Sequence, residues 1–151
     1  MVRAMLDTMI FDLIAADETL GTQLATAIAT GQLQLLTTHI QEDQLAAIPD
    51  AATRDRIDSI PRRRVATRGA VIGVSRVGQA RIGTKGGNRV IEAIGLRKRG
   101  HVEDALIAVT AAREADVLVT EDQRLTRRAK AECPGLEVWG WEQFAQHARS
   151  L

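Results

Sequence analysis

Short apolar runs recur along the chain, and most of them are followed by a stretch with helical spacing. Four runs are predicted to be strands, at residues 2–6, 32–38, 116–120 and 136–139. Their apolar residues mostly follow one another without alternation, which is typical of parallel strands buried on both faces. The pattern therefore predicts an α/β fold with a central, mostly parallel sheet flanked by helices.

The connecting segments carry the helical signals. Residues 17–31 are predicted to form a helix, with Asp17 as its N-cap and Gly31 as its stop. Further helices are predicted at residues 50–60, between two prolines, from about Val102, and at residues 141–151. This alternation of strands and helices favours one compact domain over residues 1–151.

The charge is distributed unevenly along the chain. Residues 62–100 contain eleven of the 20 basic residues but only one of the 19 acidic residues, Glu92, although the net charge of the whole chain is +1. This segment is also rich in glycine, which disfavours a continuous helix. We expect a basic insertion at about residues 62–100 that is extended at residues 75–82 and forms one or two helical turns at residues 89–100.

Other classes of protein are disfavoured by composition. The single cysteine, Cys133, allows no intramolecular disulfide. The apolar N-terminus is interrupted by Asp7 and Asp12, unlike a signal peptide or a membrane span. We therefore expect a cytoplasmic protein with no membrane partner.

Acidic residues follow three of the elements predicted to meet at one sheet edge. Asp7 ends the first strand, Glu42 and Asp43 follow the second, and Asp122 lies just beyond the third. Ligands of open α/β sheets bind beyond the carboxyl ends of the strands, so these acids can converge. Each acid could instead simply cap or end its own element.

Asp104 is placed differently from the other acids. It shares a helical face with apolar residues, namely Ile107, Ala108, Ala111 and Ala115. We therefore expect its carboxylate to point toward the interior or a cleft. For its neighbour Glu103 we prefer a place in the first helical turn, where an acid stabilises the helix dipole.

Clustered carboxylates raise one another's pKa unless a cation is bound. Mg²⁺ or Mn²⁺ would suit such oxygen ligands. Carboxylates, a divalent ion and a basic segment together describe a site for hydrolysis of phosphodiester bonds.

Three stretches resemble the PIN domain, a nuclease fold that includes the VapC-type toxins. They are MLDTMIFDLIA, TTHIQEDQL and HVEDALIAVTAAREADVLVTEDQRL, and they leave residues 62–100 unmatched. The resemblance implies a three-layer sandwich and an Mg²⁺- or Mn²⁺-dependent endoribonuclease that cleaves single-stranded RNA. It also allows a toxin role with a small antitoxin partner, and a homodimer would suit so small a domain.

The same resemblance implies a set of site residues. Asp7, Asp104 and Asp122 match three of the family's acids, and the fourth falls on Asp43 or on Glu42. The hydroxyl residues that accompany these acids are Thr8 and Thr120, which could orient a carboxylate. Met9 departs from the family, which often has a small polar residue there.

The basic segment is the predicted RNA-binding part of the chain, through contacts of its cations with phosphates. We expect these contacts from Arg62, Arg63, Arg64, Arg76, Arg81 and Lys85. The first alternative function is a nucleic-acid-binding module that keeps the fold and cleaves nothing. The second is a structural protein whose acids bind the basic segment of a neighbouring subunit.

Overall fold

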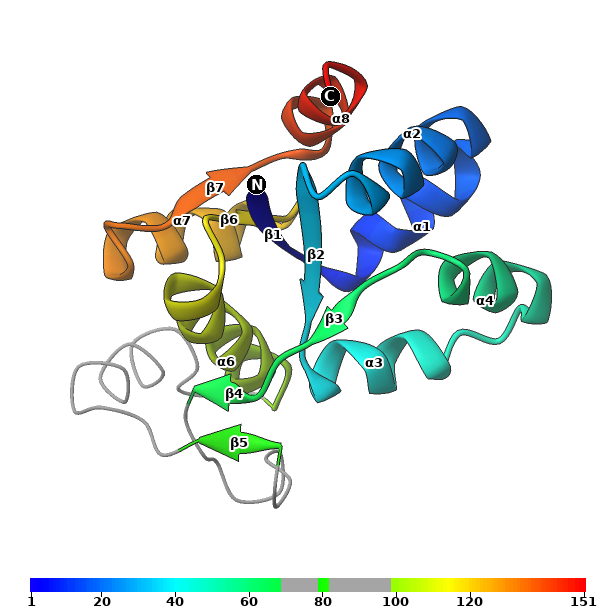
Figure 1. The fold of residues 1–151 in the computed structure, drawn as a ribbon. Helices are drawn as coiled ribbons and strands as arrows, with labels where there is room; N and C mark the ends of the chain where they lie inside the picture. Colours follow the sequence, from blue (N-terminus) through cyan, green and yellow to red (C-terminus); the bar gives the residue numbers. More distant parts are fainter. Residues whose placement is uncertain (69–78, 82–98) are drawn as a thin grey trace.

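The computed structural model describes residues 1–68, 79–81 and 99–151, and for residues 80, 81 and 99–101 it describes the backbone alone. Its central sheet has five strands in the order β3-β2-β1-β6-β7 (Figure 1). The strands are β1 (Val2–Leu6), β2 (Leu33–Thr37), β3 (Arg63–Arg64), β6 (Val117–Val119) and β7 (Glu137–Trp139). Every pair of neighbouring strands is parallel, as predicted.

Seven helices accompany the sheet within the described residues. They are α1 (Thr8–Ala16), α2 (Glu18–Ala29), α3 (His39–Ala46), α4 (Ala51–Asp58), α6 (Arg99–Glu114), α7 (Gln123–Glu132) and α8 (Trp141–Arg149). Helix α2 begins and ends as the sequence predicts: Asp17 accepts a hydrogen bond from the Leu20 N–H at its start, and Gly31 has a positive φ of 73° just past its end.

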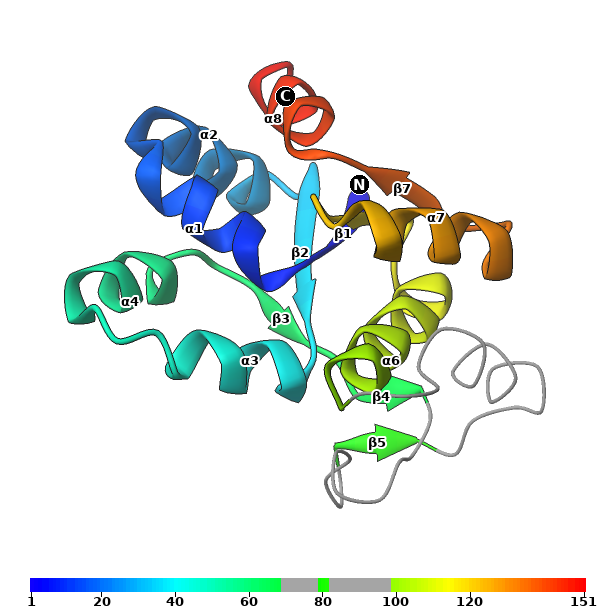
Figure 2. The same cartoon turned by 180° about the vertical axis from the view of Figure 1, so that it is seen from behind.

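The sheet is buried on both faces. Ala4 and Leu6 of β1 pack into a core with α1, α2, α4 and α8, whereas Met5 packs into a second core with α6 and α7. Figure 2 shows α6 and α7 together on one side of the sheet and α1, α2 and α4 on the other. Because successive side chains of a strand point to opposite faces, this arrangement explains why β1, β2 and β6 consist mostly of consecutive apolar residues. The α/β prediction is confirmed, and the layers are compatible with a three-layer sandwich.

Two features of the basic segment are visible. The fifth strand of the sheet, β3, was not predicted, since its two residues are both arginines. A small parallel sheet joins β4 (Thr67–Arg68) to β5 (Ala80–Arg81), so part of the expected extended region at residues 75–82 is a strand. The helical turns expected at residues 89–100 lie mostly outside the described residues, apart from the start of α6.

Gln41 fixes the position of α3 against the central strand. Its side chain is fully buried, its Oε1 accepts a hydrogen bond of 2.6 Å from the Thr38 N–H, and its Nε2 donates one of 2.6 Å to the Leu6 carbonyl. The amide thus pairs two main-chain groups next to the carboxyl end of β1. It therefore holds the start of α3 close to the residue that follows Leu6, Asp7.

Replacing Gln41 with alanine should lower the free energy of unfolding by about 1–3 kcal/mol, because two buried main-chain groups lose their partner. Urea unfolding followed by circular dichroism measures the change. Gln23→Ala, at an exposed position of α2, is the matched control and should stay within about 0.5 kcal/mol of the unchanged protein. Equal effects of the two substitutions would contradict the bracing role of Gln41.

None of the helices in the described part of the chain is long and apolar enough to cross a membrane.

Candidate functional site

Asp7 lies where β1 ends and α1 begins. Its main-chain N–H donates a 2.9 Å hydrogen bond to the Val119 carbonyl, which joins the ends of β1 and β6. Its carboxylate is the N-cap of α1, and Oδ1 accepts a 2.7 Å hydrogen bond from the Thr8 N–H. The other oxygen, Oδ2, accepts a 2.7 Å hydrogen bond from the Thr120 hydroxyl. Asp7 is therefore held at the junction of two neighbouring strands.

Thr120 links Asp7 to another predicted acid of the site. Its hydroxyl donates to Asp7 and accepts a 3.1 Å hydrogen bond from the N–H of Asp122. Asp122 in turn is the N-cap of α7, where its Oδ1 accepts from the N–H groups of Arg124 and Leu125 at 2.8 and 3.1 Å. The hydroxyl thus orients one carboxylate and fixes the backbone of the next.

Asp104 approaches the same place from α6. Burial is the largest cause that raises the pKa of its carboxyl, and the negative charges of Asp7, Asp122 and Glu103 raise it further, to about 6 in all. These charge effects put Asp104 in the electrostatic reach of both other aspartates. The residues of its helical face, Ile107, Ala108 and Ala111, are buried as predicted.

Helix α6 begins earlier than predicted, at Arg99 rather than near Val102, and its first turn contains no acid. Glu103 therefore lies in the second turn, and the prediction that it stabilises the helix dipole from the first turn is wrong. Its Oε2 instead accepts a 3.2 Å hydrogen bond from Gln44 Nε2. Gln44 also accepts a hydrogen bond from the Thr8 hydroxyl through its Oε1.

Asp7, Asp104 and Asp122, with the residues that contact them or their chain neighbours, form the candidate cluster. Gln44 and Glu103 belong to it, but the sequence did not identify them as part of the site. Gln44 bridges α1 and α6 from α3, through Thr8, which follows Asp7, and Glu103, which precedes Asp104. The sequence analysis identified the site by its acidic residues, and Gln44, a neutral amide next to Glu42 and Asp43, was therefore missed. The spacing offers one clue, because Gln44 follows Gln41 by three residues and so lies on the same side of α3.

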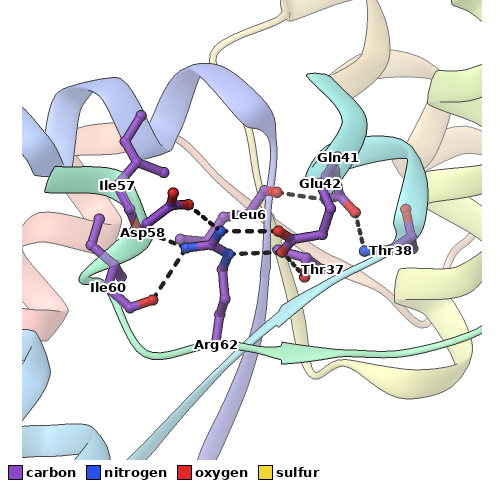
Figure 3. Close-up of polar contacts among 9 residues, drawn as sticks. All are labelled: Leu6, Thr37, Thr38, Gln41, Glu42, Ile57, Asp58, Ile60 and Arg62. Atoms are coloured by element: carbon purple, nitrogen blue, oxygen red, sulfur yellow. Dashed lines mark hydrogen bonds and ion pairs between the residues drawn. The ribbon is translucent and has the colours of Figure 1, made fainter. Parts of the chain in front are cut away.

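Neither candidate for the second acid, on α3, is among the charges that raise the pKa of Asp104. Glu42 accepts hydrogen bonds from Arg62 Nε at 2.7 Å, from Arg62 Nη2 at 2.9 Å and from the Thr37 hydroxyl at 2.7 Å (Figure 3). These contacts, with that of Arg62 first, hold the pKa of Glu42 below its usual range. Asp43 is exposed on α3, about 100° around the helix from Gln44.

Arg62 lies at the edge of the hydrophobic core. Its guanidinium contacts Glu42 and Asp58 and donates to the carbonyls of Ile57 and Ile60, and its side chain is only 11% exposed (Figure 3). The guanidinium also lies over the ring of Phe11, 5.4 Å from its centroid. Because protein groups already occupy its donors, Arg62 is no longer expected to contact RNA.

The side chains of two of the remaining predicted RNA-binding residues are described by the structure, and those of the other three are not. Arg63 and Arg64 are exposed on the edge strand β3. Arg76 and Lys85 lie outside the described residues, and for Arg81 only the backbone, in β5, is described.

Several acids also have plain structural roles. Asp7 and Asp122 cap α1 and α7, and Glu121 accepts a hydrogen bond from the Trp141 N–H at the start of α8. A Cβ at Gly140 would lie 3.0 Å from the Glu121 carboxylate, so the glycine leaves room for this cap. Asp104 differs, because no residue in the described ranges donates a hydrogen bond to its carboxyl.

The carboxylates of the cluster are suitable donors for a metal. Carboxylate oxygens suit a hard divalent cation, and those that accept hydrogen bonds keep lone pairs for a metal. The side chains as placed do not form a ligand shell: over residues 1–68, 79–81 and 99–151, no three His, Cys, Asp or Glu side chains are grouped closely enough to hold an ion. The chemistry of the donors fits, and their side chains would have to turn toward one another.

No protein-family model, curated protein or solved structure matches the chain.

Proposed function

We propose that the protein is a divalent-metal-dependent endoribonuclease that hydrolyses single-stranded RNA, with a PIN-like fold. The observation that carries the proposal is the carboxyl of Asp104, which is half-buried near Asp7 and Asp122 and has its pKa raised to about 6. An ionisable group that is partly buried near like charges, with no hydrogen-bond donor among the described residues, is typical of a functional site. Asp7 and Asp122 have structural explanations as caps, whereas the described residues offer none for Asp104.

Asp7, Asp104 and Asp122 would hold the Mg²⁺ or Mn²⁺ ion. When bound, the ion would supply charge neutralisation at the scissile phosphate and a water of lowered pKa. Thr120 would keep the Asp7 carboxylate in place through its hydrogen bond. Gln44 would hold Glu103 and Thr8 without adding a further negative charge to the cluster.

Removal of the metal should stop the reaction. Cleavage of a labelled single-stranded RNA is expected in Mn²⁺, loss of cleavage in EDTA, and recovery when Mn²⁺ is added back in excess. The ion should also raise the unfolding temperature, because it binds only the folded acids and relieves their repulsion. Calorimetry with and without Mn²⁺ measures this effect independently of activity.

Cleavage that is unaffected by EDTA, or an unfolding temperature that Mn²⁺ leaves unchanged, would contradict the metal-dependent mechanism. Ca²⁺, which is larger and less demanding in its coordination geometry, is the control ion for non-specific stabilisation.

A second candidate is a nucleic-acid-binding module that cleaves nothing. It is favoured by the absence of a formed ligand shell in the described part of the chain. This alternative expects RNA binding that is equal in Mn²⁺ and EDTA, with no product in either. The toxin role and the antitoxin stay predictions from the resemblance, and the homodimer stays a prediction from the small size of the domain.

A further inference from the structure

Helix α7 concentrates positive charge in the otherwise acidic part of the chain. Outside residues 62–100 the chain has nine basic residues, and four of them lie in α7. They are Arg124, Arg127, Arg128 and Lys130. The helix contains one acid, Glu132, at its last position.

These cations lie on the surface of the molecule. Leu125 and Ala129 are buried and attach α7 to the core, whereas Arg124, Arg127 and Lys130 are exposed. Arg127 and Arg128 are three and four residues after Arg124, so the three arginines share one flank of the helix. In Figure 2 α7 lies in front of β7, and no described element crosses it.

Like charges recur within α7 at spacings of three and four residues, which destabilises a helix. A polyanion along this flank would reduce that repulsion.

The position of the helix connects it to the acids. Its N-cap is Asp122, and Arg124 is only two residues further on. With a rise of 1.5 Å per residue, the cations from Arg124 to Lys130 cover about 9 Å of the axis. That length corresponds to about two or three nucleotides of a stacked strand, at roughly 3.4 Å each.

We propose that the exposed flank of α7 binds the phosphate backbone of the RNA strand next to the cleaved bond. The inference rests on the proposed nuclease function and adds to it the path of the substrate. The acids repel a polyanion, and the cations that begin beside Asp122 offset this repulsion where the strand leaves the site. Since α7 contains no aromatic residue, the helix binds the backbone and not the bases.

Charge reversal tests this surface. Arg127→Glu and Lys130→Glu, each in an Asp104→Asn protein that leaves the RNA intact, should weaken binding of a labelled single-stranded RNA by about tenfold at 0.1 M salt. For each phosphate that a variant no longer neutralises, the slope of log K against log salt should fall by about 0.7. Fluorescence anisotropy in EDTA measures both values without any metal.

Arg56→Glu is the matched control. Arg56 is exposed on α4, on the opposite side of the sheet, and its replacement changes the net charge by the same amount (Figure 2). It should change the affinity by less than about twofold. Effects of the α7 variants that are no larger than that of Arg56→Glu would overturn the proposed path.

The test separates this inference from the proposed chemistry. If RNA binding depends on α7 but the protein never cleaves RNA in Mn²⁺, the proposed binding surface is supported and the proposed nuclease function is refuted. If cleavage depends on the metal but the RNA affinity is unchanged by Arg127→Glu and Lys130→Glu, the proposed nuclease function is supported and the proposed binding surface is refuted.

Discussion

Asp104→Asn is expected to reduce Mn²⁺-dependent RNA cleavage by on the order of 10²–10³-fold and, at the same time, to make the protein more stable. The loss of activity would follow from removing the negative charge of a proposed metal ligand. The gain in stability follows from the pKa of Asp104, which rises from 3.8 to about 6 on folding because the charged form is partly desolvated and lies near other acids. Function and stability should therefore move in opposite directions.

The stability gain should depend on pH. Well below pH 3.8 the carboxyl is protonated in both folded and unfolded chains, so asparagine offers no advantage. As the pH rises from 3.8 through about 6, the folded state loses stability because the carboxyl ionises more easily in the unfolded chain, whereas the asparagine variant does not titrate. Discounted for partial exposure, the expected gain at pH 7.5 is about 1–2 kcal/mol, or about 3–6 °C in the unfolding temperature.

Cleavage assays and thermal unfolding between pH 4 and pH 8 measure both effects. Asp12→Asn is the matched control, since Asp12 is exposed on α1 and outside the cluster. It should preserve activity and stability at every pH. An Asp104→Asn protein that cleaves normally refutes the assigned role, and one that is less stable at pH 7.5 refutes the electrostatic account.

Arg62→Ala should lower the free energy of unfolding by about 3 kcal/mol, a large loss for a charged side chain. The substitution leaves the Glu42 carboxylate without its bidentate partner and frees the carbonyls of Ile57 and Ile60. It also removes the cation above Phe11. Arg62→Lys should recover less than half of the loss, because an ammonium group cannot reproduce the fork of contacts.

The stability that the Arg62–Glu42 pair contributes should increase with pH, whereas the contribution of Asp104 should decrease with pH. Arg62 lowers the pKa of Glu42 below its ordinary value of 4.5. The contribution of the pair is therefore complete above that value and is lost as the pH falls below it. The difference between the original protein and Arg62→Ala should shrink in acid.

Urea unfolding at pH 7 and pH 3 tests this expectation. Arg63→Ala is the control at the next position, where the side chain is exposed on β3, and it should cost less than about 0.5 kcal/mol. A small effect of Arg62→Ala, equal to that of the control, would contradict the structural role of Arg62.

The parts of the fold that depend on apolar burial were predictable. The runs at β1, β2, β6 and β7 predict strands because a buried parallel strand needs apolar residues on both faces. Arg63 and Arg64 of β3 gave no such signal, since an edge strand with exposed side chains needs only main-chain hydrogen bonds. Its existence depends on pairing with β2, which is a tertiary contact.

The candidate site was predictable to a similar degree. Strand order brings the ends of β1 and β6 together, so Asp7 and Asp122 could be placed at one edge. Asp104 could be placed by its helical face. The sequence alone could not distinguish Arg62 from Arg63. The two residues are consecutive arginines, and only the fold directs one toward the core and the other toward solvent.

The two outer strands of the sheet have a consequence for how copies of the chain meet. Strand β3 has two residues and β7 has three, so each border offers few free main-chain groups to a neighbouring molecule. Extending the sheet from one molecule into another would gain little hydrogen bonding at either border. A pair of these molecules is therefore expected to associate through a surface other than the two borders of the central sheet.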